Sequence, residues 1–184
     1  MTLRVISGKA RGRKLKSVPG DTTRPVTDRV KEALFNILAS DVIDSRWWDV
    51  FAGTGAIGIE ALSRGASFVR FTDLHREPID TIRFNVEHCG FTSQAEIRRG
   101  DAFTLLSRDA DAQFDYIYIA PPQYKDMWEK ALELVDDNMN WLSQDSWVIV
   151  QIDPREYREF PLANLEEIER RKYGTTLLVF YERK

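Results

Sequence analysis

The stretch Asp49-Val50-Phe51-Ala52-Gly53-Thr54-Gly55-Ala56-Ile57-Gly58 decides the fold, because it holds a complete G-x-G-x-x-G pattern. Residues 47–51 before it predict a strand, and residues 56–64 after it predict a helix that ends at Gly65. In such a turn the first glycine permits the tight bend, the second lets the backbone approach a ligand, and the third lets the helix pack on the sheet. The pattern therefore predicts a ligand site at the start of a helix, although a tight turn without a ligand would show the same glycines.

Strands and helices alternate along the rest of the chain. The hydrophobic pattern predicts a helix from residue 27 or 28 to about 38, strands over 68–72, 95–99, 114–119 and 147–152, helices over 77–88, 102–107 and 125–135, and a final pair of strands over 166–172 and 175–181. This alternation indicates an α/β, Rossmann-like, doubly wound fold, with a mostly parallel seven-stranded sheet, helices on both faces and an antiparallel C-terminal edge hairpin. Residues 3–7 and 14–18 predict a basic N-terminal β-hairpin extension.

The composition places the chain in a broad class. Its 184 residues suit one domain, and the single cysteine, Cys89, excludes an internal disulfide. No apolar run approaches the length of a membrane span, and the first residues do not resemble a signal peptide. His75 and His88 have no metal-ligand spacing. We therefore expect a cytoplasmic, monomeric protein with no membrane and no metal partner.

Charge is distributed unevenly. Residues 1–31 carry nine cations and two anions, whereas the remainder carries 17 cations and 27 anions. A basic arm on an acidic body favours a polyanionic partner, with nucleic acid as the first candidate, although a solvated basic face would give the same count. We expect residues 1–26 to form a basic arm within the same unit as residues 27–184. The candidate RNA-binding residues in this arm are Lys9, Arg11, Arg13, Lys14 and Arg24.

Three acidic residues stand at the ends of successive predicted strands. Asp49 precedes the glycine turn, where a pyrophosphate would be repelled and a cationic amine favoured. Asp73 is placed to accept both ribose hydroxyls, and Asp101 to accept from an adenine amine, although each could also be a helix cap. S-adenosyl-L-methionine carries an amine, a ribose and an adenine, and has no phosphate. The candidate cofactor-binding residues are Asp49, Phe51, Gly53, Thr54, Gly55, Asp73, Leu74, Asp101 and Ala102.

A proline pair follows the strand predicted over 114–119. The run Ala120-Pro121-Pro122-Gln123-Tyr124 forms a rigid turn, since each proline fixes its own φ and restricts the residue before it. The carbonyls of such a turn can accept hydrogen bonds from an exocyclic amine, and Tyr124 offers a face on which a flipped base could stack. The candidate catalytic residues are Ala120, Pro121, Pro122 and Tyr124, against the alternative of an ordinary turn with a partly buried tyrosine.

At these residues the chain resembles S-adenosylmethionine-dependent methyltransferases, and most closely the RsmD family. The segments that carry the resemblance are residues 4–15, 23–36, 49–66 and 173–176. The resemblance implies methylation of the exocyclic N2 amine of a guanine in small-subunit (16S) ribosomal RNA, as free RNA or in a 30S particle. It also implies direct transfer, with the amine and the methyl carbon held in line.

One position departs from the family pattern. The family has Asp-Pro-Pro-Tyr/Phe, and related enzymes have Asn-Pro-Pro-Tyr, whereas this chain has Ala120 in place of the acid. In the family that side chain accepts a hydrogen bond from the target amine. Backbone carbonyls of the turn or the Gln123 amide are the candidate replacements. Gln123 also occupies an apparent insertion, which shifts Tyr124 from the position of the family's aromatic.

Three alternatives fit parts of the sequence. An NAD-type oxidoreductase would use the glycine turn and Asp73, but it would place a pyrophosphate beside Asp49. A methyltransferase for adenine in nucleic acid would use the same site, because both bases present an exocyclic amine. A non-catalytic RNA-binding assembly factor would account for Ala120.

Overall fold

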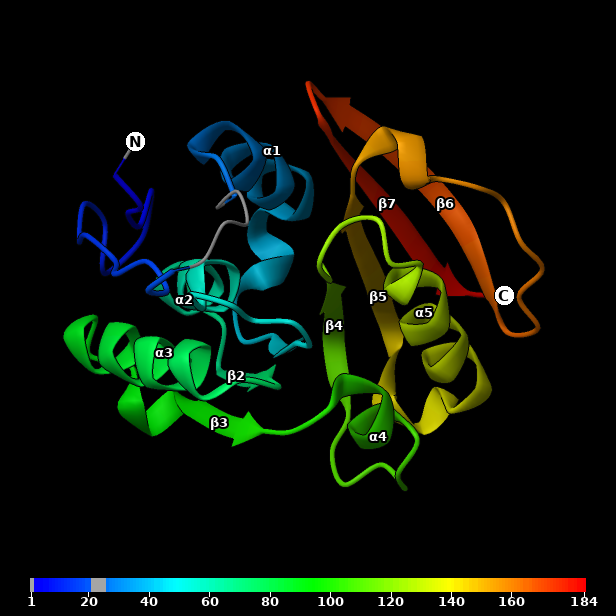
Figure 1. Ribbon diagram of the computed structural model, residues 1–184, viewed down its shortest axis with the longest axis horizontal. Coiled ribbons are helices and arrows are strands. Elements are labelled where there is room, and N and C mark those ends of the chain that lie inside the picture. The colour runs from blue at the N-terminus through cyan, green and yellow to red at the C-terminus, as the bar shows by residue number, and fades with distance from the viewer. Residues whose placement is uncertain (1, 21–25) are drawn as a thin grey trace.

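The computed structural model describes residues 2–20 and 26–184; residues 1 and 21–25, which include Arg24, lie outside the described part. A sheet of seven strands runs in the order β3-β2-β1-β4-β5-β7-β6 (Figure 1). Its strands are β1 (Arg46–Asp49), β2 (Phe68–Asp73), β3 (Ala95–Arg99), β4 (Phe114–Ile119), β5 (Leu142–Ile152), β6 (Leu165–Tyr173) and β7 (Thr176–Arg183). The first five are parallel, and β7 lies antiparallel between β5 and β6. The predicted α/β fold with an antiparallel C-terminal hairpin is confirmed.

Helices cover both faces of the sheet. They are α1 (Asp28–Leu38), α2 (Ala56–Ser63), α3 (Arg76–His88), α4 (Ala102–Leu106) and α5 (Met127–Asp137), with short 3-10 turns at Ala39–Val42, Thr92–Gln94, Met139–Trp141 and Pro154–Glu156. Figure 1 shows α2 and α3 grouped with the N-terminal arm, whereas α4 and α5 lie on the other side of the molecule. Two buried apolar clusters correspond to these layers: one joins α1, α2, α3 and the arm to the sheet, and the other joins α4 and α5 to it.

Local backbone chemistry explains where the observed boundaries differ from the predicted ones. The strand predicted over 47–51 ends at Asp49, because Val50 and Phe51 already enter the glycine turn. The helix predicted from 125 begins at Met127, after Asp126 with a φ of 51°. The strand predicted from 147 begins at Leu142, which pairs with Phe114 across a register shift. An irregular pairing of this kind hides the alternation by which strands are recognised.

The N-terminal arm is packed into the domain. The two predicted strands reduce to one antiparallel bridge, Arg4 with Lys14, so the hairpin has less regular pairing than expected. The buried Glu60 of α2 accepts the backbone N–H groups of Ile6 and Ser7 at 2.9 and 3.0 Å. A Cβ at Gly8 would stand 1.8 Å from the Ser63 carbonyl oxygen, so only glycine permits this approach.

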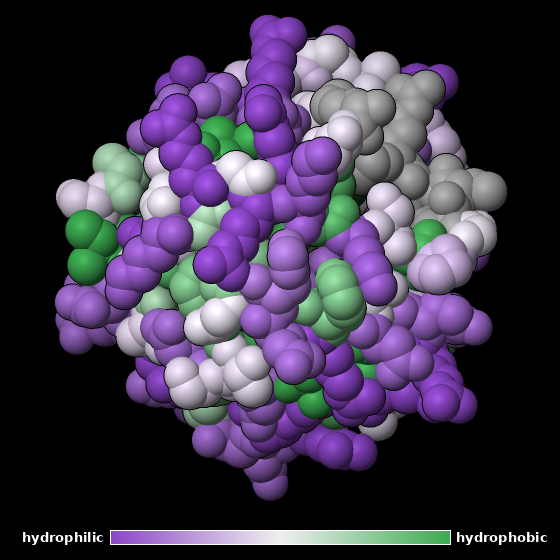
Figure 2. Space-filling view, turned by 90° about the vertical axis from the view of Figure 1, so that its left-hand side faces the viewer, coloured by the Kyte–Doolittle hydropathy of each residue, from purple (hydrophilic) through white to green (hydrophobic). Residues whose placement is uncertain are grey.

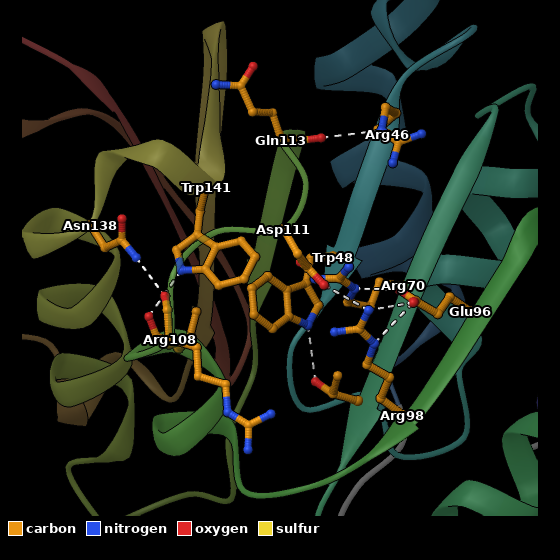
Figure 3. A network of polar contacts seen from close by, with 12 residues as sticks. Arg46, Trp48, Arg70, Glu96, Arg98, Arg108, Asp111, Gln113, Asn138 and Trp141 are labelled. Atoms are coloured by element: carbon orange, nitrogen blue, oxygen red, sulfur yellow. Dashed lines mark hydrogen bonds and ion pairs between the residues drawn. The ribbon is translucent and has the colours of Figure 1, made fainter.

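A network of charges joins β2 and β3 to the loop before β4 (Figure 3). Arg70 is 3% exposed, and its guanidinium pairs with Glu96 at 2.5 Å and Asp111 at 2.9 Å. Arg98 pairs with the same two carboxylates. The Arg70 guanidinium also lies 5.2 Å from the ring centroid of Trp48, where a cation is attracted to the ring. The paired Arg70 side chain therefore packs on aromatic residues of the core while its charge is balanced by two carboxylates.

Candidate functional site

A cavity of about 910 Å³ opens at the carboxyl ends of the parallel strands, beside the point where the strand order reverses between β1 and β4. Ligands of open α/β sheets bind at this place. Eight of the nine residues that we expect to bind a cofactor line the cavity: Asp49, Phe51, Gly53, Thr54, Asp73, Leu74, Asp101 and Ala102. The ninth, Gly55, caps the start of α2 with a φ of 80°. The structure thus brings together residues that are far apart in the sequence.

The glycines of the turn differ in what they allow. Gly53 has a φ of 56°, and a Cβ there would meet no atom within 4 Å among the described residues, so its backbone faces open space. At Gly58 a Cβ would stand 2.3 Å from Cε1 of Phe71 on β2. The first glycine therefore permits the turn and leaves open space beside it, and the last permits close packing of α2 on the sheet, as the pattern predicted for these two positions.

Asp73 holds the glycine turn in place. Its Oδ2 accepts the Gly53 N–H at 3.0 Å, and its Oδ1 accepts the His75 N–H at 3.2 Å. Each carboxylate oxygen can accept more than one hydrogen bond, so both can still receive hydroxyl groups of a ligand. The carboxylate is preorganised at the cavity wall, because the backbone on both sides fixes it.

Asp49 is the buried charge of the site. Asp49 is 2% exposed. Burial raises the pKa of its carboxyl to about 7; a hydrogen bond from the Gly58 N–H opposes this shift, and the nearby charge of Asp73 adds to it. Within residues 2–20 and 26–184, no Lys, Arg or His forms an ion pair with it. A buried carboxylate with no cationic partner is costly, and a cation entering the cavity would relieve that cost.

Asp101 combines two roles at the start of α4. Its Oδ2 accepts the backbone N–H and the hydroxyl of Thr104, both at 2.9 Å, which is an ordinary helix cap. The residue also lines the cavity, so its other oxygen remains available to a ligand donor. The cap fixes the position of the carboxylate, and the two readings of this residue are compatible.

Only part of the proline turn, residues 120–123, lies in the cavity wall. Ala120, Pro121, Pro122 and Gln123 line the cavity, and Tyr124 does not. The Tyr124 hydroxyl donates to Asp153 Oδ2 at 2.7 Å, Arg155 bonds the same hydroxyl, and the Arg155 guanidinium lies 5.4 Å from the ring centroid. The Asp153 carboxylate, by accepting this hydroxyl, raises the pKa of Tyr124. The structure therefore holds the ring against the segment after β5.

Sequence reasoning missed several residues of the cavity wall. Residues 18–20 of the arm, His75, Tyr118, Gln151 and Thr176 line it, and we had assigned none of them to the site. Tyr118 donates to the side-chain oxygen of Gln151, so β4 and β5 contribute a joined polar pair. The available signal for Gln151 was a single polar residue directly after the apolar run 147–150.

The cations of the arm lie on the surface. Lys9, Arg11, Arg13 and Lys14 are all exposed, and Arg13 donates to the His88 carbonyl oxygen of α3. Hydrophilic side chains predominate on the face that includes the arm and α3 (Figure 2). Arg24 lies outside the described residues.

Neither a metal-binding cluster nor a membrane-spanning helix occurs among the described residues. No group of three or more His, Cys, Asp or Glu side chains there is arranged to hold a metal ion. Within that same part of the chain, every helix is too short or too polar to cross a lipid bilayer.

Solved structures with this architecture define the class of protein. The yhhF protein of Escherichia coli, a candidate methyltransferase, superposes with a TM-score of 0.87 at 29% identity, covering 100% of this chain and 99% of its own. The HI0767 protein of Haemophilus influenzae, a candidate methylase, has a TM-score of 0.79 at 31% identity, covering 100% of this chain and 99% of its own. The fold is that of the Rossmann-like methyltransferases.

Sequence comparison then gives the family. The chain belongs to the family described as "Conserved hypothetical protein 95", which matches residues 3–182. Ribosomal RNA small subunit methyltransferase D of Haemophilus influenzae is 34% identical over 181 residues, covering 97% of this chain and 91% of its own. YlbH of Bacillus subtilis, a candidate rRNA methyltransferase, is 35% identical over 184 residues, covering 99% of this chain and 100% of its own. The resemblance to the RsmD family is confirmed.

Proposed function

We propose that this protein transfers a methyl group from S-adenosyl-L-methionine to the exocyclic N2 amine of a guanine in small-subunit ribosomal RNA. Relatives across the family with the same length and fold are rRNA methyltransferases by name, which supports the RNA class of substrate. The relatives that are named rRNA methyltransferases favour a cytoplasmic site of action, on free RNA or a 30S particle. The guanine amine follows from the resemblance to the RsmD family.

The burial of the Asp49 carboxylate is the observation that best supports the proposal. A buried carboxylate without a cationic partner in the described residues fits the ammonium group of the methionine part. The same carboxylate disfavours the oxidoreductase alternative, because a dinucleotide would bring its pyrophosphate to the glycine turn beside Asp49 and Asp73. The negative charge at the glycine turn therefore favours S-adenosylmethionine over a dinucleotide, whereas the glycine pattern alone fits both ligands.

The other cavity residues suit the remaining parts of the cofactor. Asp73 would accept the ribose hydroxyls, Asp101 the adenine amine, and Phe51, Leu74 and Ala102 would form apolar walls around the adenine. The open backbone at Gly53 leaves room for the ligand to approach. When bound, this cofactor supplies an activated methyl group on a sulfonium. The protein has then to exclude water and align the target amine.

On the target side, Ala120, Pro121 and Pro122 would form the seat of the base. The proline rings restrict the backbone of this turn, and its carbonyls would accept hydrogen bonds from a base flipped out of its stack. Tyr124 fits the role of base platform less well, because its ring is held by Asp153 and Arg155. We propose that it stiffens the proline turn from outside the cavity.

The arm is the proposed RNA contact. Lys9, Arg11, Arg13 and Lys14 are exposed and stand on a scaffold fixed to α2 and α3, and Arg24 belongs to the same basic segment. Such cations bind RNA phosphates without reading sequence and release counterions. We propose residues 1–26 as this RNA-contacting arm and residues 27–184 as the methyltransferase domain, within a monomeric unit.

The test is a methyl-transfer assay with product identification. Purified protein is incubated with tritiated S-adenosylmethionine and 30S particles, protein-free 16S RNA or duplex DNA, and the labelled nucleoside is identified after digestion. Label in N2-methylguanosine is expected. Label in N6-methyladenine refutes the base, and calorimetric binding of NADH without binding of S-adenosylmethionine refutes the class of reaction.

The alanine at position 120 is the one observation that favours a second function, binding of cofactor and RNA without catalysis. A protein that binds the cofactor and RNA without transferring the methyl group would also tolerate loss of the acidic residue. It predicts saturable binding of both partners with no labelled product in any of the three substrates above.

A further inference from the structure

Ala120 and Gln151 are neighbours at the carboxyl edge of the sheet. The strands β4 and β5 run parallel with Tyr118 opposite Ile149 and Ile119 opposite Val150, so the next step of the register brings Ala120 opposite Gln151. Opposed residues of a parallel pair point to the same face. Both residues line the cavity, and Ala120 carries no atom beyond Cβ. The room that an acidic side chain at position 120 would fill is therefore next to the Gln151 amide.

Tyr118 fixes the orientation of this amide. It stands two residues before Ala120 on the same face, is 1% exposed, and donates its hydroxyl to Gln151 Oε1. Burial, with the nearby Asp49, raises the pKa of Tyr118, so the phenol keeps the proton that it donates. A side-chain amide oxygen accepts two hydrogen bonds, which leaves one free on Gln151.

The geometry points to Gln151, held by Tyr118, as the acceptor that binds one N–H of the target's exocyclic amine in place of the missing acid at position 120. This inference rests on the proposed function. Among the other acceptors, Gln123 is exposed on the proline turn, whereas Gln151 stands on a central strand. Asp49 lies opposite Tyr118, two residues before the level of Ala120, and is assigned to the cofactor. A strand holds a positioning group more firmly than a turn.

The chemistry requires orientation and no proton acceptor on the protein. The lone pair of the amine nitrogen forms the new N–C bond, the C–S bond breaks with its electron pair remaining on sulfur, and the amine then loses one proton to water. An N–H held by Gln151 directs the lone pair at the methyl carbon. The amide itself takes up no proton, so it positions the substrate throughout.

The first experiment measures binding, independently of methyl transfer. Guanosine 5′-monophosphate and inosine 5′-monophosphate differ in the exocyclic amine, and each is titrated by calorimetry into the protein loaded with S-adenosylhomocysteine. The wild type should prefer the guanine nucleotide about fivefold, the size of one neutral hydrogen bond. Gln151→Leu should lower guanine binding to the inosine level and leave inosine binding unchanged. Gln123→Leu, the matched control, should keep the preference.

Two further variants distinguish a contact from a structural role. Gln151→Glu keeps an acceptor of the same size and should keep the preference, and Ala120→Asp should restore it in the Gln151→Leu background. Equal loss of both nucleotides in Gln151→Leu, an unchanged preference, a wild type with no preference for any purine that carries an exocyclic amine, or no rescue by Ala120→Asp would each overturn the inference. If the wild type instead prefers adenosine monophosphate over purine riboside monophosphate and Gln151→Leu removes that preference, the amine contact stands and the guanine assignment fails.

Discussion

Replacing Asp49 by asparagine should stabilise the cofactor-free protein at alkaline pH while it weakens cofactor binding. The carboxyl has a pKa of about 7 in the folded protein against 3.8 for the free side chain, because burial disfavours its charge. Between these two values the folded state holds a proton that the unfolded state has released. The free energy of unfolding of the wild type therefore falls as pH rises through this window.

The magnitude follows from the two pKa values of Asp49. A native value of about 7 and an unfolded value of 3.8 reduce the wild-type free energy of unfolding by roughly 2 kcal/mol at pH 5 and roughly 4 kcal/mol at pH 8. Asparagine does not titrate, so the variant should gain roughly 2–3 kcal/mol of stability relative to the wild type between these pH values. For a chain of this length, the Tm of Asp49→Asn relative to the wild type should therefore rise by roughly 5–10 °C between pH 5 and pH 8.

The assay is thermal unfolding of the wild type, Asp49→Asn and Asp101→Asn from pH 5 to pH 8. Asp101→Asn is the matched control for the replacement of aspartate by asparagine, since asparagine also caps a helix and the substitution should cost little stability. Calorimetry should show S-adenosylmethionine binding roughly 10- to 150-fold weaker in Asp49→Asn, the loss of one charged hydrogen bond. A pH-independent Tm difference for Asp49→Asn, or undiminished cofactor binding, would refute the reasoning.

Three other substitutions test the rest of the structure. Gly58→Ala should lower the free energy of unfolding by about 1–3 kcal/mol in urea, because its Cβ would stand 2.3 Å from Phe71; an unchanged midpoint would contradict the packing role. Lys14→Gln should reduce the slope of log affinity for RNA against log salt by about 0.7–0.9 in filter binding, whereas Lys172→Gln on β6 should not. Tyr124→Phe should lower the urea midpoint only slightly, because the exposed hydroxyl loses its bond to Asp153, and should leave cofactor affinity unchanged; a loss of that affinity would place the ring at the site.

The order of strands and helices was readable from the sequence because each element shows its own periodicity. The helix over Asp28–Leu38 has its cap, Thr27, and its apolar face in the sequence itself. Errors arose where the backbone departs from regular pairing, as at Leu142 in β5 and Asp126 before α5. Such irregularities depend on neighbours that are distant in the sequence, so a local pattern does not reveal them.

The candidate site was predictable in part for a similar reason. Asp49, Asp73 and Asp101 each follow or end a strand, and the carboxyl ends of parallel strands meet at one edge of the sheet. Gln151 was missed because its relation to Ala120 is set by the register between β4 and β5, which the sequence does not display. Tyr124 was predicted to lie in the site because it follows the two prolines in the sequence. Its contacts are with Asp153 and Arg155, which belong to another segment of the chain and could not be predicted from the local pattern.

The arm and the glycine turn are joined by one buried side chain, which bears on how the RNA contact must be tested. Asn85 of α3 is fully buried; its Nδ2 donates to the carbonyl oxygens of Lys16 at 3.0 Å and Thr54 at 2.9 Å, and its Oδ1 accepts the Lys16 N–H at 2.8 Å. Deleting the arm would leave Asn85 and Glu60 with unpaired buried groups, each costing about 1–3 kcal/mol. A truncated protein would therefore lose stability and cofactor binding together with RNA binding. Charge-removing substitutions at exposed lysines keep these contacts, so they alone separate an RNA-binding role of the arm from its structural one.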